Sequence, residues 1–332
     1  MQTVCWSVVH GVNSMAPIFP KLQRRPRWRL HPKLVPYVLL APFVLLFFIF
    51  GLFPLLFSLF LAFQSWEPTS GLANMSYVGL DNFIFTLEDE WFWKSIKNTF
   101  WLAAVSGIPQ HLIAIPLACV IHAQFKRTRN ATVGAYFLPY ITSTVAIAMM
   151  FSTLFSTDYG LINQVIAGAA QLPLVGSFFP QQPIDWLGES EFIKPAISFV
   201  VFWRYVGFNT VLYLAALQTI PKDMYEAATM DGASRWSQFW YITLPSLKPM
   251  IYFGVTLTLI GGLQLFEEPF ILTGGRGGSD QSGMTTAMYM YRTAFDFNDF
   301  GTASALSWIL FVFVAVLTWL TNLAFKPKRG ET

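Results

Sequence analysis

The chain has 332 residues and a formal net charge of +3, with 54% hydrophobic and 12% charged residues. Soluble domains carry roughly 25% charged residues, so the composition excludes an ordinary soluble protein and indicates an integral membrane protein. The small positive excess gives no reason to expect a nucleic-acid partner.

Six apolar runs are each long enough to cross a bilayer, which takes about 20 helical residues. We therefore expect an all-α integral membrane protein with about six transmembrane helices. Its transmembrane domain would cover residues 34–325, between cytoplasmic tails at 1–33 and 326–332. Prolines inside several runs predict kinks, which membrane helices tolerate because neighbouring groups bind the freed carbonyls. The runs are Leu34–Phe63, Ile96–Ile121, Thr132–Phe155, Phe192–Leu217, Met250–Leu272 and Thr302–Phe325.

The basic segment before the first run could be confused with a secretory signal. The apolar run that follows is too long for the core of a signal, and no A-x-A-like site closes it. We expect a retained first helix, and Met15 is a candidate for the true start of the protein.

The positions of Lys and Arg predict the orientation of the chain. Most of the 21 such residues lie in the N-terminal segment, residues 126–129, residues 222–248 and the C-terminal segment. Because Lys and Arg are enriched on the cytoplasmic side of membrane proteins, both termini and residues 218–249 are predicted to be cytoplasmic. The opposite connections carry Trp66, Trp91 and Trp93 near the ends of the runs, as expected of interfacial anchors.

A polar segment, Tyr225–Pro249, separates the fourth and fifth runs. Pro221 and the helix formers after it predict a short helix that breaks at Asp231-Gly232. A second short helix, Ser234–Tyr241, is expected to end before Pro245. Two short helices joined at a glycine corner would project from the membrane, a shape suited to docking another protein.

No group of residues in the sequence predicts catalysis. His111 and His122 lie too far apart on one helix to share a metal, and the two cysteines are Cys5 and Cys119. No G-x-x-x-x-G-K-[ST] phosphate loop occurs, and the glycine-rich run Gly274–Gly278 is expected to form a flexible external turn. We therefore expect no enzymatic activity and no metal or cofactor on this chain.

The polar segment also carries a family signature. It contains E-A-A, a glycine four residues later and then I-x-L-P, and the flanks read A-A-L-Q-x-I-P before it, T-G-G after it and G-L-D-N-F near residue 80. This pattern resembles the inner-membrane permease subunits of ABC importers, in the maltose and multiple-sugar branch. The resemblance covers about Leu34–Lys328. Its motif residues are Glu226, Ala227, Ala228, Gly232, Ile242, Leu244 and Pro245, with Asp231 beside the glycine.

This resemblance implies the type I ABC importer permease fold in a bacterial inner membrane. It implies that the loop at 218–249, a cytoplasmic helix-turn-helix, couples the chain to one of two cytoplasmic ATPase subunits that hold the ATP and magnesium. The other implied partners are a second homologous permease, an extracytoplasmic solute-binding protein and a sugar. The competing interpretation of the loop is an amphipathic helix held on the membrane surface by Trp236 and Trp240.

Polar groups at membrane depth indicate a substrate path, because they are costly there unless they face a cavity or a partner. Arg204 lies near the middle of the fourth run, and Gln264, Glu267 and Glu268 lie in the fifth. Alternatively, Arg204 pairs with Glu267 or Glu268 to neutralise buried charge, and the two roles are compatible. The resemblance implies sugar contacts from Arg204, Tyr205, Phe208, Gln264, Phe266 and Glu267.

Two other functions compete with a sugar importer. Arg204 suits the phosphate of glycerol-3-phosphate or a related polyol, although Glu267 and Glu268 would repel it. An ion-coupled secondary transporter is a different class, but no inverted repeat is visible and the projecting loop would then have no partner.

Overall fold

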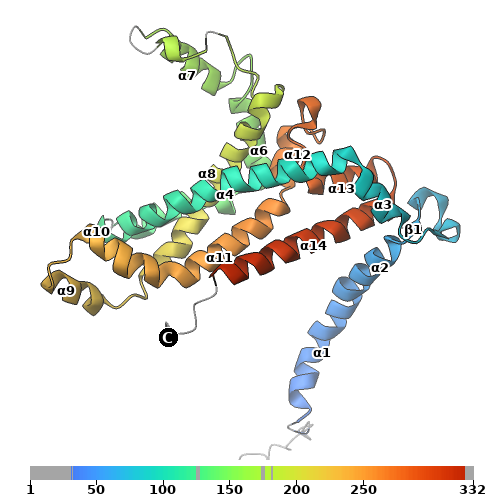
Figure 1. Ribbon diagram of the computed structural model, residues 1–332, viewed down its shortest axis with the longest axis horizontal. Helices are drawn as coiled ribbons and strands as arrows, with labels where there is room; N and C mark the ends of the chain where they lie inside the picture. The colour runs from blue at the N-terminus through green and yellow to red at the C-terminus, as the bar shows by residue number, and fades with distance from the viewer. Residues whose placement is uncertain (1–30, 32, 125–127, 173–175, 181, 326–332) are drawn as a thin grey trace, which may run out of the picture. The chain divides into compact units, whose positions relative to one another are not determined.

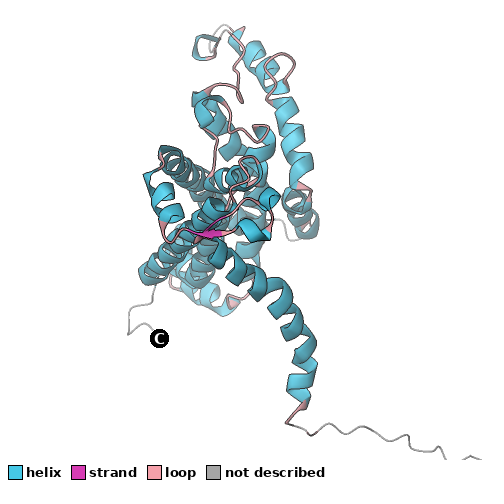
Figure 2. Ribbon diagram, turned by 90° about the vertical axis from the view of Figure 1, so that its right-hand side faces the viewer, coloured by secondary structure: helices cyan, strands magenta, loops and turns pink. Residues whose placement is uncertain are grey.

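The computed structural model describes residues 31, 33–124, 128–172, 176–180 and 182–325, and this part of the chain is almost entirely helical (Figures 1 and 2). Its strands are β1 (Gln64–Ser65) and β2 (Ser76–Tyr77), an antiparallel pair with Gln64 opposite Tyr77. The chain divides into two units, Met1–Leu55 and Leu56–Thr332. The predicted tails, 1–33 and 326–332, lie outside the described residues apart from His31 and Lys33.

The first apolar run forms α1 (Val35–Phe47), a π-helical turn (Phe48–Leu52) and α2 (Phe53–Leu61). The π turn ends two residues before Pro54, which lacks a backbone N–H and cannot donate a helical hydrogen bond. The Phe53 amide instead donates to the carbonyl of Phe48, five residues back. A wide turn of this kind keeps the helix continuous through the proline.

After the β pair, the second unit continues with helices from α3 to α14. Their bounds are α3 Asp81–Glu88, α4 Glu90–Gln124, α5 Arg129–Ile141, α6 Thr144–Leu154, α7 Leu161–Ala170, α8 Ser190–Leu217, α9 Lys222–Met230, α10 Arg235–Gln238, α11 Leu244–Leu263, α12 Glu267–Leu272, α13 Thr286–Phe295 and α14 Phe300–Phe325. A π turn joins α10 to α11 over Phe239–Thr243, and 3-10 turns lie at Pro68–Ser70, Leu72–Asn74, Gly176–Phe178 and Ser279–Gln281.

The core of the second unit lies where α4 and α8 pack together and α11 packs against both. Figure 1 shows α4, α11 and α14 running side by side, with α8 crossing α4. One buried cluster gathers Ile147, Ile197 and Leu265 from α6, α8 and the segment before α12. A second gathers Ile121, Tyr213 and Leu247 from α4, α8 and α11.

Five helical stretches in the described part of the chain have the length and composition to cross a membrane, or six if one bent pair counts as a single span. The prediction of an all-α membrane protein with about six spans is confirmed. The bent pair corrects one detail: the run predicted as one helix over Thr132–Phe155 is α5 and α6, which meet at 90°. Pro139 removes one helical hydrogen bond. Three residues later Thr142 is extended and its hydroxyl donates to the Leu138 carbonyl (2.8 Å), which ends α5.

The fifth apolar run also differs from the prediction at both ends. Pro245 does not stop the second short helix. The helix continues from α10 through the π turn into α11, and Pro245 is the second residue of α11, directly after that wider turn. At the other end, the run predicted as Met250–Leu272 breaks at residues 264–266, so α12 is a separate short helix.

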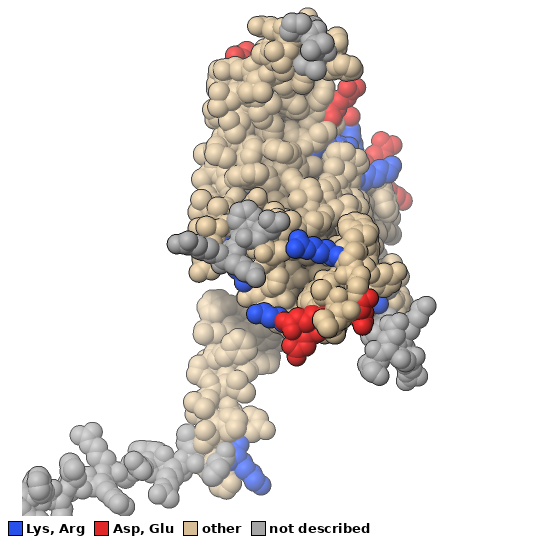
Figure 3. All heavy atoms as spheres, turned by 90° about the vertical axis from the view of Figure 1, so that its left-hand side faces the viewer, with Lys and Arg blue, Asp and Glu red and all other residues tan. Residues whose placement is uncertain are grey.

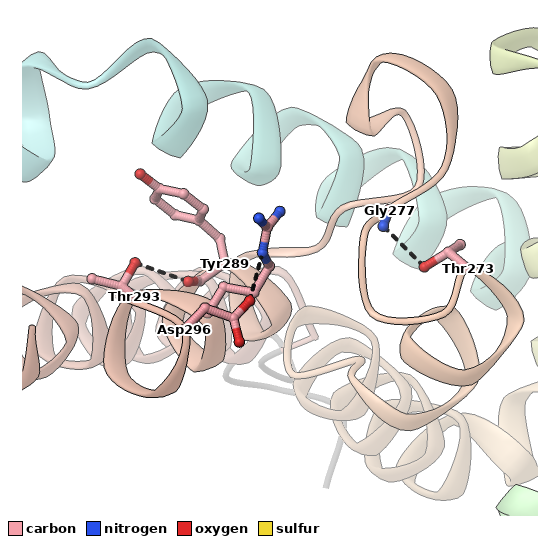
Figure 4. A network of polar contacts seen from close by, with 6 residues as sticks. Thr273, Gly277, Tyr289, Thr293 and Asp296 are labelled. Atoms are coloured by element: carbon pink, nitrogen blue, oxygen red, sulfur yellow. Dashed lines mark hydrogen bonds and ion pairs between the residues drawn. The ribbon is translucent and has the colours of Figure 1, made fainter. Parts of the chain in front are cut away.

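The glycine-rich run Gly274–Gly278 lies between α12 and α13. The sequence predicts a flexible turn here, but backbone amides within it make hydrogen bonds to α12 and to Thr273. The Gly277 amide donates to Thr273 Oγ1 (3.0 Å) and the Gly275 amide to the Phe270 carbonyl (2.7 Å). Figure 4 shows Thr273 and Gly277 facing each other, and a separate group of contacts on α13 in which Thr293 donates to the Tyr289 carbonyl. Gly277 has φ +76°, and a Cβ there would lie 2.9 Å from the amide nitrogen of Met284. Glycine is required because the turn closes on its own backbone.

Candidate functional site: a membrane cavity and a projecting helix pair

A cavity of about 230 Å³ lies among α4, α5, α8 and α11. No Lys, Arg, Asp or Glu is among its lining residues. They are Ser106, Gln110, Tyr140, Val201, Tyr205, Phe208, Asn209, Leu257, Thr258, Gly261, Gly262 and Leu265. The lining therefore combines aromatic rings with uncharged hydrogen-bonding groups.

One wall of the cavity is aromatic. The ring of Tyr140 on α5 stacks on Phe208 of α8, with centroids 4.5 Å apart and planes 27° from parallel. Tyr140 also meets Tyr205 edge to face at 5.8 Å. Offset and edge contacts of this kind stabilise aromatic clusters, so the three rings fix one another. Flat aromatic faces suit the C–H patches of a sugar ring.

This wall depends on a close approach of α5 and α8 at Gly207. A Cβ on Gly207 would lie 1.7 Å from the carbonyl oxygen of Tyr136, well inside van der Waals contact. Only glycine lets the two backbones come this near. The approach brings Tyr140, one turn after Tyr136, onto Phe208.

Asn209 is one of the lining residues, and its side chain carries a buried oxygen without a hydrogen-bond partner among the described residues. Asn209 Nδ2 donates to Gln110 Oε1 (3.0 Å), joining α8 to α4. Asn209 is 1% exposed, and its Oδ1 has no hydrogen-bond partner in the described part of the chain. A buried acceptor without a donor is costly.

Arg204 lies directly behind the aromatic wall. Its Nη1 is 2.6 Å from Glu268 Oε1, and the two side chains are 11% and 3% exposed. The same Nη1 donates to the Tyr205 hydroxyl (3.3 Å). The sequence left open whether Arg204 pairs with Glu267 or Glu268; the structure pairs it with Glu268, while Glu267 is exposed.

The six residues proposed for the substrate path are thus divided. Tyr205 and Phe208 line the cavity and Arg204 lies behind it. Gln264 and Phe266, in the segment before α12, line a second, larger cavity of about 590 Å³ together with α13 and α14, and its other lining residues are mostly apolar. Glu267 is exposed and lines neither cavity. Sequence reasoning did not identify Tyr140, Gln110, Asn209 and Thr258, which come from four different helices. Gln110 and Asn209 had a readable signal, because each is a polar amide within an apolar run.

A second candidate site is the helix pair α9–α10. The two helices are joined by a tight turn at Gly232, which ends α9. The Gly232 amide donates to the Thr229 carbonyl (3.0 Å) and the Ala233 amide to the Ala228 carbonyl (2.9 Å). Gly232 has φ +78°. These two bonds around a left-handed residue define a Schellman motif, in which glycine is favoured because it has no Cβ. The turn then leads into α10, whose first amides are capped by Ser234 (3.2 Å to the Ser237 amide).

The helix pair α9–α10 has few contacts that would fix it from inside. The Tyr225 hydroxyl lies 2.9 Å from Thr243 Oγ1, which ties α9 to the π turn. Most other side chains of the pair are exposed, including Met230 (88%) and Trp236 (70%). Figure 3 looks toward this end of the molecule and shows acidic and basic side chains over its surface. The motif positions are arranged as follows: Glu226, Ala227, Asp231, Gly232 and Pro245 are exposed, and Ala228, Ile242 and Leu244 are half-buried.

Comparison with known proteins identifies the family. The profile of the "Binding-protein-dependent transport system inner membrane component" family matches residues 112–326. The chain is 32% identical to the lactose transport system permease protein LacF of Rhizobium radiobacter, over 88% of this chain and 94% of that protein. It is 30% identical to the arabinooligosaccharides transport system permease protein AraP of Bacillus subtilis, over the full length of both.

A solved structure supports the same assignment. The bacterial alginate ABC transporter, in complex with an alginate pentasaccharide-bound periplasmic protein, contains a chain that superposes with a TM-score of 0.73 at 26% identity, over 88% of this chain and 94% of that one. The chain belongs to the family of binding-protein-dependent transport system inner membrane components. The resemblance to ABC importer permeases of the carbohydrate branch, predicted from the motif, is confirmed, and the protein is a multi-pass inner-membrane permease subunit.

Proposed function

We propose that this chain is one of the two membrane-spanning subunits of an ATP-driven importer for a sugar, most simply an oligosaccharide, and forms half of its passage. The observation that supports a sugar as the substrate is the cavity, whose aromatic wall and uncharged polar groups match the C–H faces and hydroxyls of a sugar. The names of the relatives support a carbohydrate, since they include lactose and arabinooligosaccharide permeases.

The proposed partners are a second homologous permease, two cytoplasmic ATPase subunits and an extracytoplasmic solute-binding protein. The sequence has no phosphate loop of its own, so the energy of ATP would enter through separate subunits that hold ATP and magnesium. The family description and the periplasmic protein in the alginate complex support a solute-binding protein. Both termini of this chain would face the cytoplasm.

The coupling element would be the helix pair α9–α10. Ala227 and Ala228 allow a partner surface to come close, and Glu226 and Asp231 offer carboxylates to partner donors. The exposure of Glu226, Ala227 and Gly232 supports this assignment, because a docking element has to be accessible before its partner binds. When the ATPases close on ATP, the pair would move the spans between inward- and outward-open states.

Tyr140 provides a test of the substrate passage. We expect Tyr140→Ala to lower the uptake rate at saturating binding protein about tenfold, because one aromatic contact is worth roughly 1 kcal/mol and the loss also frees Tyr205 and Phe208. The measurement is uptake of radiolabelled sugar into proteoliposomes that contain the complete importer. Tyr136→Ala is the matched control, because this tyrosine lies one turn earlier on α5 and is 41% exposed. Equal loss of uptake in both variants would contradict a role for the cavity wall.

The function itself is tested with the complex purified after co-expression with its partners. We expect a sugar presented by the binding protein to stimulate ATP hydrolysis, in a panel of neutral and charged sugars. In cells, collapse of the proton gradient with ATP kept high should leave uptake intact. Loss of uptake under that condition would favour an ion-coupled transporter.

A further inference from the structure

The cavity lining is uncharged, but one buried ion pair lies immediately beside it. Arg204 Nη1 lies within hydrogen-bonding distance of the Tyr205 hydroxyl (3.3 Å), and the Arg204 guanidinium is centred 5.2 Å from the Tyr205 ring. Tyr205 lines the cavity, and so does Leu265, three residues before Glu268. The pair is therefore separated from the cavity by the thickness of one side chain.

Arg204 by itself would make this cavity attractive to anions. A guanidinium binds carboxylates and phosphates through parallel N–H donors. At membrane depth its field is weakly screened, because charges interact more strongly in a low-dielectric surrounding. A permease with an unpaired arginine at this position would favour acidic or phosphorylated sugars over neutral ones.

Glu268 removes that attraction. Its carboxylate lies 2.6 Å from Arg204 Nη1 and is 3% exposed, so the arginine charge is matched at close range. Glu267 precedes it and is exposed, which adds one negative charge on the same short helix α12. The net charge of Arg204, Glu267 and Glu268 is thus negative when all three are ionised, and an anion in the cavity would be repelled rather than bound.

We infer that Glu268 is a specificity-determining residue that cancels Arg204, so that the passage accepts uncharged oligosaccharides and rejects uronic or phosphorylated ones. The inference rests on the proposed sugar importer and deepens it by naming the charge class of the substrate. It also separates this chain from the structurally similar alginate transporter, whose substrate is an acidic polysaccharide. Glu268 does not line the cavity itself; it acts through the charge of Arg204, which contacts Tyr205 of the cavity wall.

The experiment measures direct binding to the complete importer in lipid nanodiscs, without the solute-binding protein, so that only the membrane subunits select. The probes are tritiated maltotriose and arabinotriose, which are neutral, and tritiated trigalacturonate, an acidic trisaccharide. We expect the wild-type complex to bind a neutral probe and to show at least about tenfold weaker binding of trigalacturonate. This comparison uses the wild-type complex alone, so it does not depend on whether any variant folds.

Glu268→Gln is expected to raise trigalacturonate affinity about tenfold while neutral binding stays within about twofold, because Arg204 then lacks its counter-charge. Three controls separate charge from fold. Glu267→Gln keeps the ion pair and should not reproduce the gain. The double variant Arg204→Gln/Glu268→Gln removes the arginine as well and should again reject trigalacturonate. Melting temperatures of each complex report its integrity.

The outcomes distinguish the two proposals. Wild-type binding of trigalacturonate equal to or above neutral binding would overturn the specificity role and leave a sugar importer standing. A folded Glu268→Gln variant with unchanged selectivity, or a double variant that gains acidic binding, would overturn it as well. Binding of none of the three probes by the wild-type complex would overturn both the charge selection and the proposed sugar passage.

Discussion

Replacing Gly232 with glutamine is expected to reduce sugar uptake and sugar-stimulated ATP hydrolysis at least about tenfold while the chain remains in the membrane. Gly232 has φ +78°, and an ordinary residue forced into the left-handed region costs roughly 1–3 kcal/mol. No atom lies within 4 Å of a Cβ at this position, so the new side chain would clash with nothing in the chain, and the cost is limited to the backbone of the turn. The side chain would project from the surface at which we propose the ATPase binds.

Two variants separate the backbone effect from the surface effect. Asparagine tolerates a positive φ better than most residues, and its side chain is one methylene shorter than that of glutamine. Gly232→Asn should therefore retain more coupling of transport to ATP hydrolysis than Gly232→Gln. Glu226→Lys leaves the turn alone and reverses a charge on the exposed face of α9; we expect it to uncouple transport as well. Glu67→Lys, an equally exposed reversal outside the helix pair, should have little effect. Unchanged uptake in both Gly232→Gln and Glu226→Lys would refute docking through α9–α10.

Gly207→Ala is expected to destabilise the folded protein by several kcal/mol and to abolish uptake. Overpacking a tight core typically costs about 1–3 kcal/mol, and here the added carbon would lie 1.7 Å from a backbone oxygen, Tyr136 O. A flexible side chain can rotate away from a clash, but a carbonyl inside α5 cannot. Relief requires α5 and α8 to separate, which would pull Tyr140 off Phe208 and open the aromatic wall.

The measurement is the thermal unfolding midpoint of the purified complex, together with the amount of protein recovered from the membrane. Gly134→Ala is the matched control, since it makes the same substitution on α5 and a Cβ there meets nothing within 4 Å. Alanine is also the better helix former, so this variant should be neutral or slightly stabilising. If Gly207→Ala melted within a degree or two of Gly134→Ala, the close approach of α5 and α8 would not matter to stability.

Some residues of the candidate site could be predicted from the sequence, because the pattern that marks them lies within a short stretch of the chain. Arg204 was identified as a polar residue in an apolar run, and the E-A-A pattern identified α9 and the glycine corner. Tyr140 was not identified, because nothing in its run distinguishes it from other aromatic residues of a membrane helix. The same limit applied to the partner of Arg204: Glu267 and Glu268 differ by about 100° around a helix, and the break at residues 264–266 decides which one faces α8.

The amino-acid sequence alone determined the membrane class, the apolar runs and the family motif, since each depends on composition or on residues close together in the chain. Only the tertiary structure decided the 90° bend between α5 and α6, the helix that continues through Pro245, and the cavity built from four helices. Bends and helix contacts depend on which backbone groups find partners and how near two helices can come. The distance between α5 and α8 is set by the contact of Gly207 with the backbone of Tyr136, which lies on another helix and about 70 positions away along the chain.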